Sequence, residues 1–289
     1  MNNNYKLIPT LLVTALLATG CSFIPTLDKP EPPVSTQYPI ATAETNAPAA
    51  DLPWKSFYTD ARLQQIIGTA LENNRDLRVA VLNIELARAQ YDIQGSRLLP
   101  EVGAGANASR ARSQLTGQYG NSYSVGLSLP SWEIDFWGRV RSLKDQALAQ
   151  YLATEEGRKG AQISLISSVA NTWLGLQADE ELLEISRRTL QTREESIKLA
   201  KLRFDAGAAS ELDFRQAQTL TENARATLAQ QTRQRDLDIN ALTLLVGQQV
   251  PQELLTSLKG KKLTDLPVLT DVPAGLPSDL LLRRPDIRQ

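Results

Sequence analysis

The side chains that could do chemistry in this sequence are few, and they form no recognisable catalytic set. The chain has no histidine, which removes the commonest general base and the commonest metal ligand. Asp, Glu and Arg are plentiful, but none stands in a catalytic spacing, and a charged helix face is more often simply solvated. We therefore predict no bound cofactor or metal and no enzymatic activity, and we keep an enzyme as a minor alternative.

A glycine pattern near residue 105 gives a false indication of nucleotide binding. Gly103, Gly105 and Ala108 match the G-x-G-x-x-A fingerprint of dinucleotide-binding proteins. That fingerprint requires a strand before it and a helix after it. Here the expected order is a helix followed by a strand, so the pattern predicts no nucleotide site. The net charge of −1 likewise provides no basic surface for a nucleic acid.

Cys21 carries the one covalent modification that the sequence favours. Residues 1–20 have the pattern of a secretory signal peptide, with an apolar run that is too short to span a bilayer. Ala18-Thr19-Gly20 before the cysteine resembles a bacterial lipoprotein box, in which Cys21 is lipidated and becomes the mature N-terminus. Ser22, in place of Asp, favours the outer membrane of a Gram-negative bacterium. The alternative is an ordinary cleaved signal with a stray cysteine.

A tether and a helix are expected after Cys21. Residues 22–53 hold seven of the fifteen prolines, with Ala, Thr and Ser between them, so we predict an extended tether over 21–53. A helix is expected over 54–98, before Pro100. Its apolar residues recur every seven positions, which favours supercoiled packing against other helices; an amphipathic helix on a globular core is the alternative. This row consists of Leu63, Ala70, Leu77, Ile84 and Tyr91.

The sequence period changes to two over 99–137. Apolar residues alternate with small or polar ones from Val102 to Ala108 and again from Tyr123 to Leu129, which predicts two strands joined by a polar loop over 110–121. One apolar and one small polar face is typical of a transmembrane β-barrel hairpin. The alternative, a soluble two-stranded sheet, would be marginal in water. The aromatic residues that follow, either at a membrane interface or in a small soluble core, are Trp132, Phe136 and Trp137.

The longest expected element is a helical hairpin over 138–247. This stretch contains no proline and consists mostly of good helix formers. One interruption, at 204–210, divides it into two helices, the first of about 65 residues and ~100 Å. Gly207 can end the first helix with a positive φ, and Ser210 with Asp213 predicts a capping box for the second. Helices this long need support along their sides, so we predict a mainly α fold of antiparallel, coiled-coil-like helices.

The last part of the sequence indicates an internal repeat. Prolines divide residues 248–279 into short pieces, which we interpret as a linker. Leu280–Arg288 then parallels Ala70–Arg78, with Asp-Ile-Arg in place of Asp-Leu-Arg. We therefore interpret 280–289 as the start of a second copy of the helix–hairpin–helix unit.

Four stretches together resemble the lipoprotein branch of the outer-membrane efflux factors, the TolC-like exit ducts of tripartite drug pumps. They are Leu71–Arg78, Trp132–Arg139, Arg203–Asp213 with Gln216–Gln218, and Gly275–Ile287. The resemblance implies a homotrimer in which each full-length chain has two repeats. Three chains then close one β-barrel in the outer membrane and one α-helical tunnel across the periplasm. The present chain would supply half of an α-barrel protomer and one transmembrane β-hairpin, with 248–279 at the equator.

The resemblance also implies partners. The duct is passive, contacts outer-membrane lipid, and works with a periplasmic adaptor protein and an inner-membrane efflux transporter that powers export. The family's gating carboxylates belong to the second repeat, so we transfer no gate residue. The turn between the long helices corresponds to the periplasmic tip that meets the adaptor. Its predicted contact residues are Arg203, Phe204, Asp205, Gly207, Ala208, Ser210, Leu212 and Asp213.

Two further expectations concern the alternatives. A periplasmic lipoprotein adaptor with a helical hairpin is the second functional hypothesis, and aromatic-flanked membrane strands would distinguish the duct from it. The sequence printed carries one repeat and the first residues of the next. We expect this polypeptide alone not to form a working duct, because open strand edges cannot lie in hydrocarbon. Six copies imitating three whole chains is the surviving alternative.

Overall fold

The structure, a computed structural model, describes residues 53–112, 114, 117–129, 131–265 and 283–289. The chain divides into two compact units. One contains residues 82–155, and the other contains residues 53–81 and 156–289. The predicted signal peptide, Cys21 and nearly all of the predicted tether lie outside the described residues.

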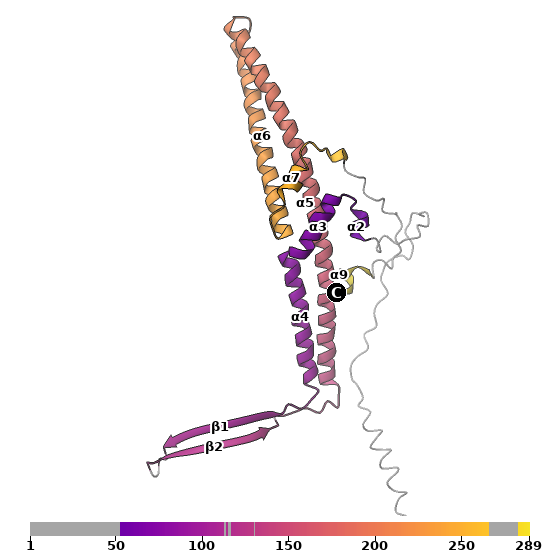
Figure 1. Ribbon diagram of the computed structural model, residues 1–289, viewed down its shortest axis with the longest axis vertical. Helices are drawn as coiled ribbons and strands as arrows, with labels where there is room; N and C mark the ends of the chain where they lie inside the picture. Colours follow the sequence, from indigo (N-terminus) through magenta and orange to yellow (C-terminus); the bar gives the residue numbers. More distant parts are fainter. Residues whose placement is uncertain (1–52, 113, 115–116, 130, 266–282) are drawn as a thin grey trace, which may run out of the picture. The chain divides into compact units, whose positions relative to one another are not determined.

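The described residues are mainly helical, with one two-stranded sheet (Figure 1), so the predicted fold class is confirmed. The long helices are α4, α5 and α6, and the two strands come between α4 and α5 in the sequence. In chain order the elements are α2 (Trp54–Phe57), α3 (Ala61–Asn73), α4 (Arg75–Ser96), β1 (Gly103–Arg112), β2 (Tyr119–Ser128), α5 (Arg139–Asp205), α6 (Glu211–Val246), α7 (Gln252–Thr256), η2 (Leu263–Asp265) and α9 (Pro285–Arg288).

The single helix predicted over 54–98 is instead three helices, α2, α3 and α4. The break between α3 and α4 falls at Asn74, whose backbone is extended. Asn74 Oδ1 accepts a hydrogen bond from the backbone N–H of Leu77 (2.8 Å), while its Nδ2 donates to the carbonyl of Leu245 in α6 (2.8 Å). The side chain thus caps α4 and links it to a helix far away in the sequence, which the local pattern did not indicate.

The two strands pair antiparallel over their whole length. The apolar positions share one face, since Ala104 pairs with Leu127 and Ala106 with Val125. Pairing continues to Arg112 and Tyr119, so the connection is shorter than the polar loop predicted over 110–121. Polar side chains do not prevent this extension, because the ladder uses backbone groups.

The helices α5 and α6 form the predicted long hairpin, with 67 and 36 residues respectively. Figure 1 shows α6 running back along the last part of α5. Polar groups join the two helices at intervals. Thr221 Oγ1 donates to the carbonyl of Arg193 (3.2 Å), and the side chains of Arg225 and Glu194 form an ion pair (3.3 Å).

The hydrophobic core lies in the unit that contains most of this hairpin. It forms where α3, the middle of α5, the C-terminal end of α6 and the segment around α7 meet. Trp173 of α5 is fully buried at its centre. Its other members with the least exposure are Ile67, Ala70, Val169, Ala170, Leu176, Leu242 and Leu258. The core therefore fixes the C-terminal end of α6, while the turn at 206–210 lies at the other end of that helix.

Candidate functional site

The turn between α5 and α6 is closed by backbone hydrogen bonds that end α5. Gly207 has a φ of 71°, and its N–H donates to the carbonyl of Phe204 (2.9 Å). The N–H of Ala208 reaches back to the carbonyl of Arg203 (2.8 Å). These two bonds make a Schellman motif, which satisfies carbonyls that a helix end leaves unpaired. The predicted left-handed cap at Gly207 is confirmed.

The start of α6 has the predicted capping box. Ser210 Oγ accepts a hydrogen bond from the backbone N–H of Asp213 (3.2 Å), and the Asp213 carboxylate accepts from the backbone N–H of Ser210 (3.2 Å). Hydrogen bonds from the Ser210 side chain and then from its backbone lower the pKa of Asp213 below its ordinary value. The carboxylate also lies at the positive end of the helix dipole, so charge and geometry both favour this helix start.

Two phenylalanines stack across the turn. The rings of Phe204 and Phe214 are 5.7 Å apart and nearly parallel, at 10°. The cations of Lys201 and Arg215 lie 6.0 and 5.8 Å from the Phe214 ring, and Lys201 also pairs with Asp205 (3.1 Å). Such ring and cation contacts are modest individually, but together they hold the two helix ends in one arrangement.

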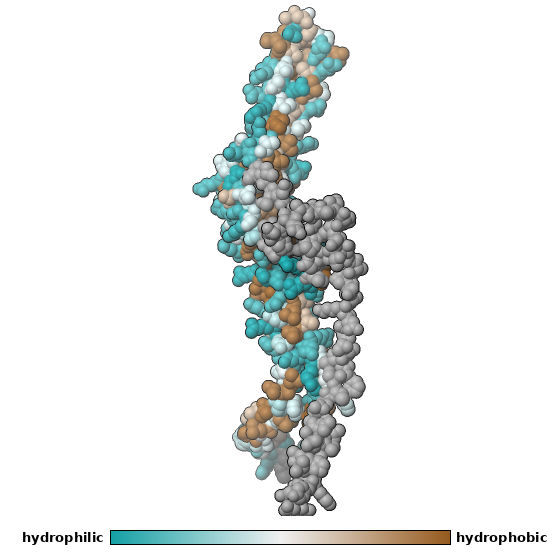
Figure 2. All heavy atoms as spheres, turned by 90° about the vertical axis from the view of Figure 1, so that its right-hand side faces the viewer, coloured by the Kyte–Doolittle hydropathy of each residue, from teal (hydrophilic) through white to brown (hydrophobic). Residues whose placement is uncertain are grey.

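The predicted tip residues therefore come together at one exposed turn. Leu212 is 66% exposed and Phe204 37% exposed. Figure 2 shows apolar and hydrophilic side chains intermixed along this hairpin up to its end. The prediction did not include Phe214, Lys201 and Arg215, whose ring and cation contacts stabilise the turn. A phenylalanine on each side of a glycine turn was the signal that could have identified the stack.

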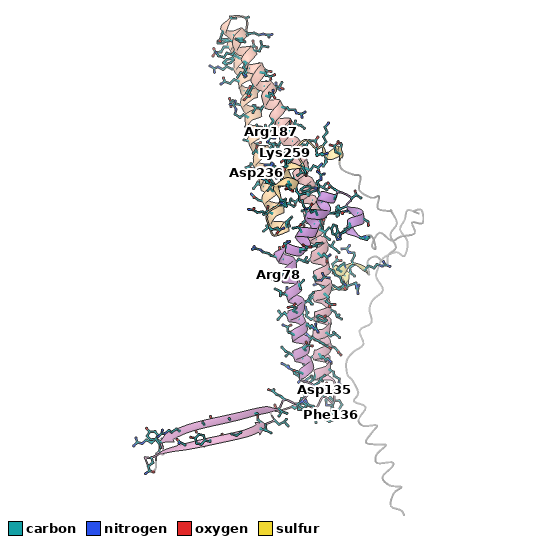
Figure 3. All side chains as sticks on the ribbon, viewed as in Figure 1. Arg78, Asp135, Phe136, Arg187, Asp236 and Lys259 are labelled. Carbon is teal, nitrogen blue, oxygen red and sulfur yellow. The ribbon has the colours of Figure 1, made fainter. Side chains whose placement is uncertain are left out.

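The predicted aromatic residues lie in the turn that leads into α5. Trp132, Phe136 and Trp137 are 42%, 62% and 68% exposed. Between them, Asp135 accepts a hydrogen bond from the backbone N–H of Arg141 (2.9 Å) and caps the helix (Figure 3). Burial alone would raise the pKa of Asp135, but hydrogen bonds from backbone N–H groups and from Arg141 lower it below its ordinary value.

The same turn is held by an ion pair that the prediction did not include. Glu133 accepts hydrogen bonds from the guanidinium of Arg139, which lowers the pKa of this carboxyl. Gly138 takes a positive φ of 79° directly before the helix begins. The turn is thus held by hydrogen bonds and an ion pair, and its aromatic side chains are exposed.

Two features of the described residues bear on the kind of site that they could form. In the described part of the chain, no group of three or more His, Cys, Asp or Glu residues could hold a metal ion. Among the described residues, none of the helices combines the length and the apolar composition of a membrane-spanning helix. Cys21 lies outside the described residues, so its predicted lipidation stays a prediction.

Comparison with known proteins decides the family. The family profile described as outer membrane efflux protein matches residues 66–248, which include α4, both strands, α5 and α6. The chain belongs to the outer membrane efflux protein family. This membership confirms the resemblance found in the sequence. The family is one of efflux proteins and not of enzymes.

Individual members of this efflux family are similar over nearly the whole chain. The probable efflux pump outer membrane protein TtgC of Pseudomonas putida is 43% identical over 98% of this chain and 60% of its own length. The outer membrane protein OprJ of Pseudomonas aeruginosa is 41% identical over 96% of this chain and 58% of its own. The open-state structure of the Neisseria gonorrhoeae MtrE outer membrane channel has a TM-score of 0.72 at 36% identity, covering 93% of this chain and 60% of that one.

These similarities have two consequences. The predicted localisation, the outer membrane of a Gram-negative bacterium, is confirmed by the family and by these relatives. The chain spans about 60% of the length of the curated relatives that it matches.

Proposed function

We propose that the chain is an outer-membrane channel subunit of a tripartite efflux pump. In this role it is part of a passive duct that exports drugs and other small molecules across the periplasm and the outer membrane. The observation that carries the proposal is the helical hairpin, in which a helix of 67 residues, about 100 Å long, reverses at a capped and exposed tip. An element of this length fits a protein that bridges a distance, because it exceeds what a globular core requires.

The other parts of the chain receive roles that fit this one. We assign β1 and β2 to the outer membrane, because their apolar residues share one exposed face: Tyr123 is 76%, Val125 87% and Leu127 82% exposed. We assign Trp132, Phe136 and Trp137 to the membrane interface, where aromatic rings are favoured. Cys21 supplies the lipid anchor, and three intact chains form the channel. The adaptor hypothesis loses its support, because the relatives are named as outer membrane proteins.

We assign the tip, with Arg203, Phe204, Asp205, Gly207, Ala208, Ser210, Leu212 and Asp213, to contact with a periplasmic adaptor protein. The support for this assignment is exposure together with rigidity. The turn presents apolar side chains to solvent while its backbone is fixed by caps at both helix ends, so little order has to be gained on binding. The exporting transporter in the inner membrane would then couple to the duct through that adaptor.

Gly207→Pro in the full-length protein tests the assignment. Proline cannot adopt the positive φ of Gly207 and removes the N–H that bonds to Phe204. We expect the variant to assemble as trimers, to bind the adaptor at least about tenfold more weakly, which corresponds to roughly 1.4 kcal/mol of binding free energy, and to reduce drug resistance. Gly260→Pro is the matched control, since Gly260 also has a positive φ (75°) but lies away from the tip. Normal resistance in Gly207→Pro would refute the adaptor contact.

A further inference from the structure

We propose that Asp179 of α5 and Asp238 of α6 form a proton-dependent lock between the two long helices. One shared proton joins the carboxyl groups, and loss of that proton leaves two negative charges facing each other. The inference concerns the pairing of two helices of this chain, so it does not rest on the proposed function.

The Asp238 carboxyl group lies against the face of α5 that carries Gly175 and Asp179. Gly175 and Asp179 are four residues apart and therefore lie on one face of α5. Asp238 Oδ2 is 3.8 Å from the position that a Cβ atom on Gly175 would occupy, so the Asp238 carboxyl group reaches the face of α5 on which Asp179 lies one turn further on. Gln234 Nε2 donates to the other oxygen, Oδ1, at 3.1 Å. Asp238 is thus anchored on its own helix through one oxygen, while the other faces α5.

The pair needs a proton to be satisfied. Ionised carboxylates only accept hydrogen bonds, so two of them in contact have no donor between them. Asp179 Oδ2 is buried and has no hydrogen-bond partner within the described part of the chain. A single proton on either group supplies the missing donor and removes the repulsion. Burial, and then the hydrogen bond and charge of Asp238, raise the pKa of Asp179 to about 6.

The two carboxylates that follow Asp179 in the sequence are bound to other groups. Glu180 pairs with Arg235, which also contacts Asp236 (3.2 Å). Glu181 accepts a hydrogen bond from the backbone N–H of Leu263 (2.9 Å). Figure 3 labels Asp236 on α6. The pKa of Asp179 is raised by burial and by Asp238, and no neighbouring cation contributes to the shift. Gln177 Nε2 of α5 donates to the carbonyl of Lys262 (3.1 Å), on a described segment after α7 that also carries the charged residues Lys259, Lys261 and Asp265.

The direction of the pH effect follows from the two pKa values of Asp179. The ordinary value for an aspartate is 3.8, and the folded value is about 6. Between these values the folded pair holds a proton that the separated helices release. The contribution of the lock to stability is therefore complete below a pH of about 4 and is lost as the pH rises through about 6.

Hydrogen exchange on the purified protein in detergent tests the lock directly. The backbone amides of residues 175–182 and 234–241 are followed from pH 4.5 to 7.5, with the rates corrected for intrinsic exchange. We expect their protection to fall on the order of tenfold as the pH rises, below the ceiling of about a hundredfold that a shift of two pKa units allows. The expected change is smaller than this ceiling because Asp179 is partly exposed, and solvent screens its interaction with Asp238.

Isosteric variants separate the lock from other pH effects. In Asp238→Asn the amide can donate to Asp179 at every pH, so the protection of both segments should become independent of pH. Asp179→Asn should have the same effect, and it decides the question if Asp238→Asn folds poorly. Asp236→Asn is the matched control on an exposed neighbouring residue and should keep the pH dependence of the parent. A flat profile in the parent, or an unchanged one in both asparagine variants, would overturn the proposal.

Discussion

Helix α6 lies between two left-handed glycines whose surroundings differ completely. Gly207 ends α5 with a φ of 71°, and Gly247 ends α6 with a φ of 79°. Among the described residues, no atom lies within 4 Å of the place that a Cβ on Gly207 would take. A Cβ on Gly247 would be 2.3 Å from the carbonyl oxygen of Asn73. The same local device thus ends one helix in open space and the other against the backbone of the α3–α4 break.

The difference shows what each end of α6 is built to do. The tip is held by neighbours in sequence, and its side chains are exposed to solvent. The Gly247 end is held by residues more than 150 positions away, including Asn74, which donates to the carbonyl of Leu245. A substitution at the tip should therefore alter a local turn, whereas one at the core end should loosen the whole junction.

Gly247→Ala should give the largest loss of stability. The alanine would pay for a left-handed backbone, about 1 kcal/mol, and would also overlap the Asn73 carbonyl, adding about 2 kcal/mol of overpacking. We expect the melting temperature, followed by circular dichroism of the purified protein, to fall by roughly 10 °C.

Alanine substitutions at two other glycines with a positive φ serve as controls for the backbone strain. Gly207→Ala and Gly260→Ala carry the same backbone strain without the overlap, so each should cost only about 1 kcal/mol. Equal losses at Gly207 and Gly247 would show that the close approach of Asn73 does not matter.

Asn74→Ala should give the second largest effect. It removes the cap of α4, about 1 kcal/mol, and leaves the partly buried carbonyl of Leu245 without its donor, about 1 kcal/mol more. Asn74→Ser keeps a capping oxygen but is too short to reach Leu245, so urea unfolding should show about half the loss. If both variants unfolded at the same denaturant concentration, the link to α6 would be the dominant interaction and the cap would contribute little.

Ser210→Ala should give the smallest effect, about 1 kcal/mol, confined to the first turn of α6. The pKa of Asp213 is lowered by Ser210, so the capping box stabilises the tip above the ordinary aspartate value and loses that contribution as the pH falls through the lowered pKa. Hydrogen exchange at residues 211–214 should therefore speed up in acid in the parent and show little further change in Ser210→Ala. An acid response that survives unchanged in the variant would assign it to another carboxylate.

Elements whose signals are local could be predicted from the sequence. The Gly207 cap and the Ser210–Asp213 capping box needed only residues a few positions apart, and their geometry agrees with the prediction. The alternation around Ala106 and Val125 likewise predicted two strands, although polar residues hid their true ends. The break between α3 and α4 was not predicted, because the interaction that fixes it involves a residue far away in the sequence. The break at Asn74 depends on the carbonyl of Leu245, which no window around residue 74 contains.

The sequence by itself determined the helical hairpin, the strand period and the family, because helix propensity, side-chain alternation and motif identity are properties of neighbouring residues. Only the tertiary structure decided which surfaces meet. It brought the Asn73–Asn74 backbone against Gly247 and the Asp238 carboxyl group against Gly175. It also buried Trp173 among residues from α3, α6 and the segment around α7. These contacts form between elements that are far apart in the chain, so no short stretch of sequence contains both partners of a contact.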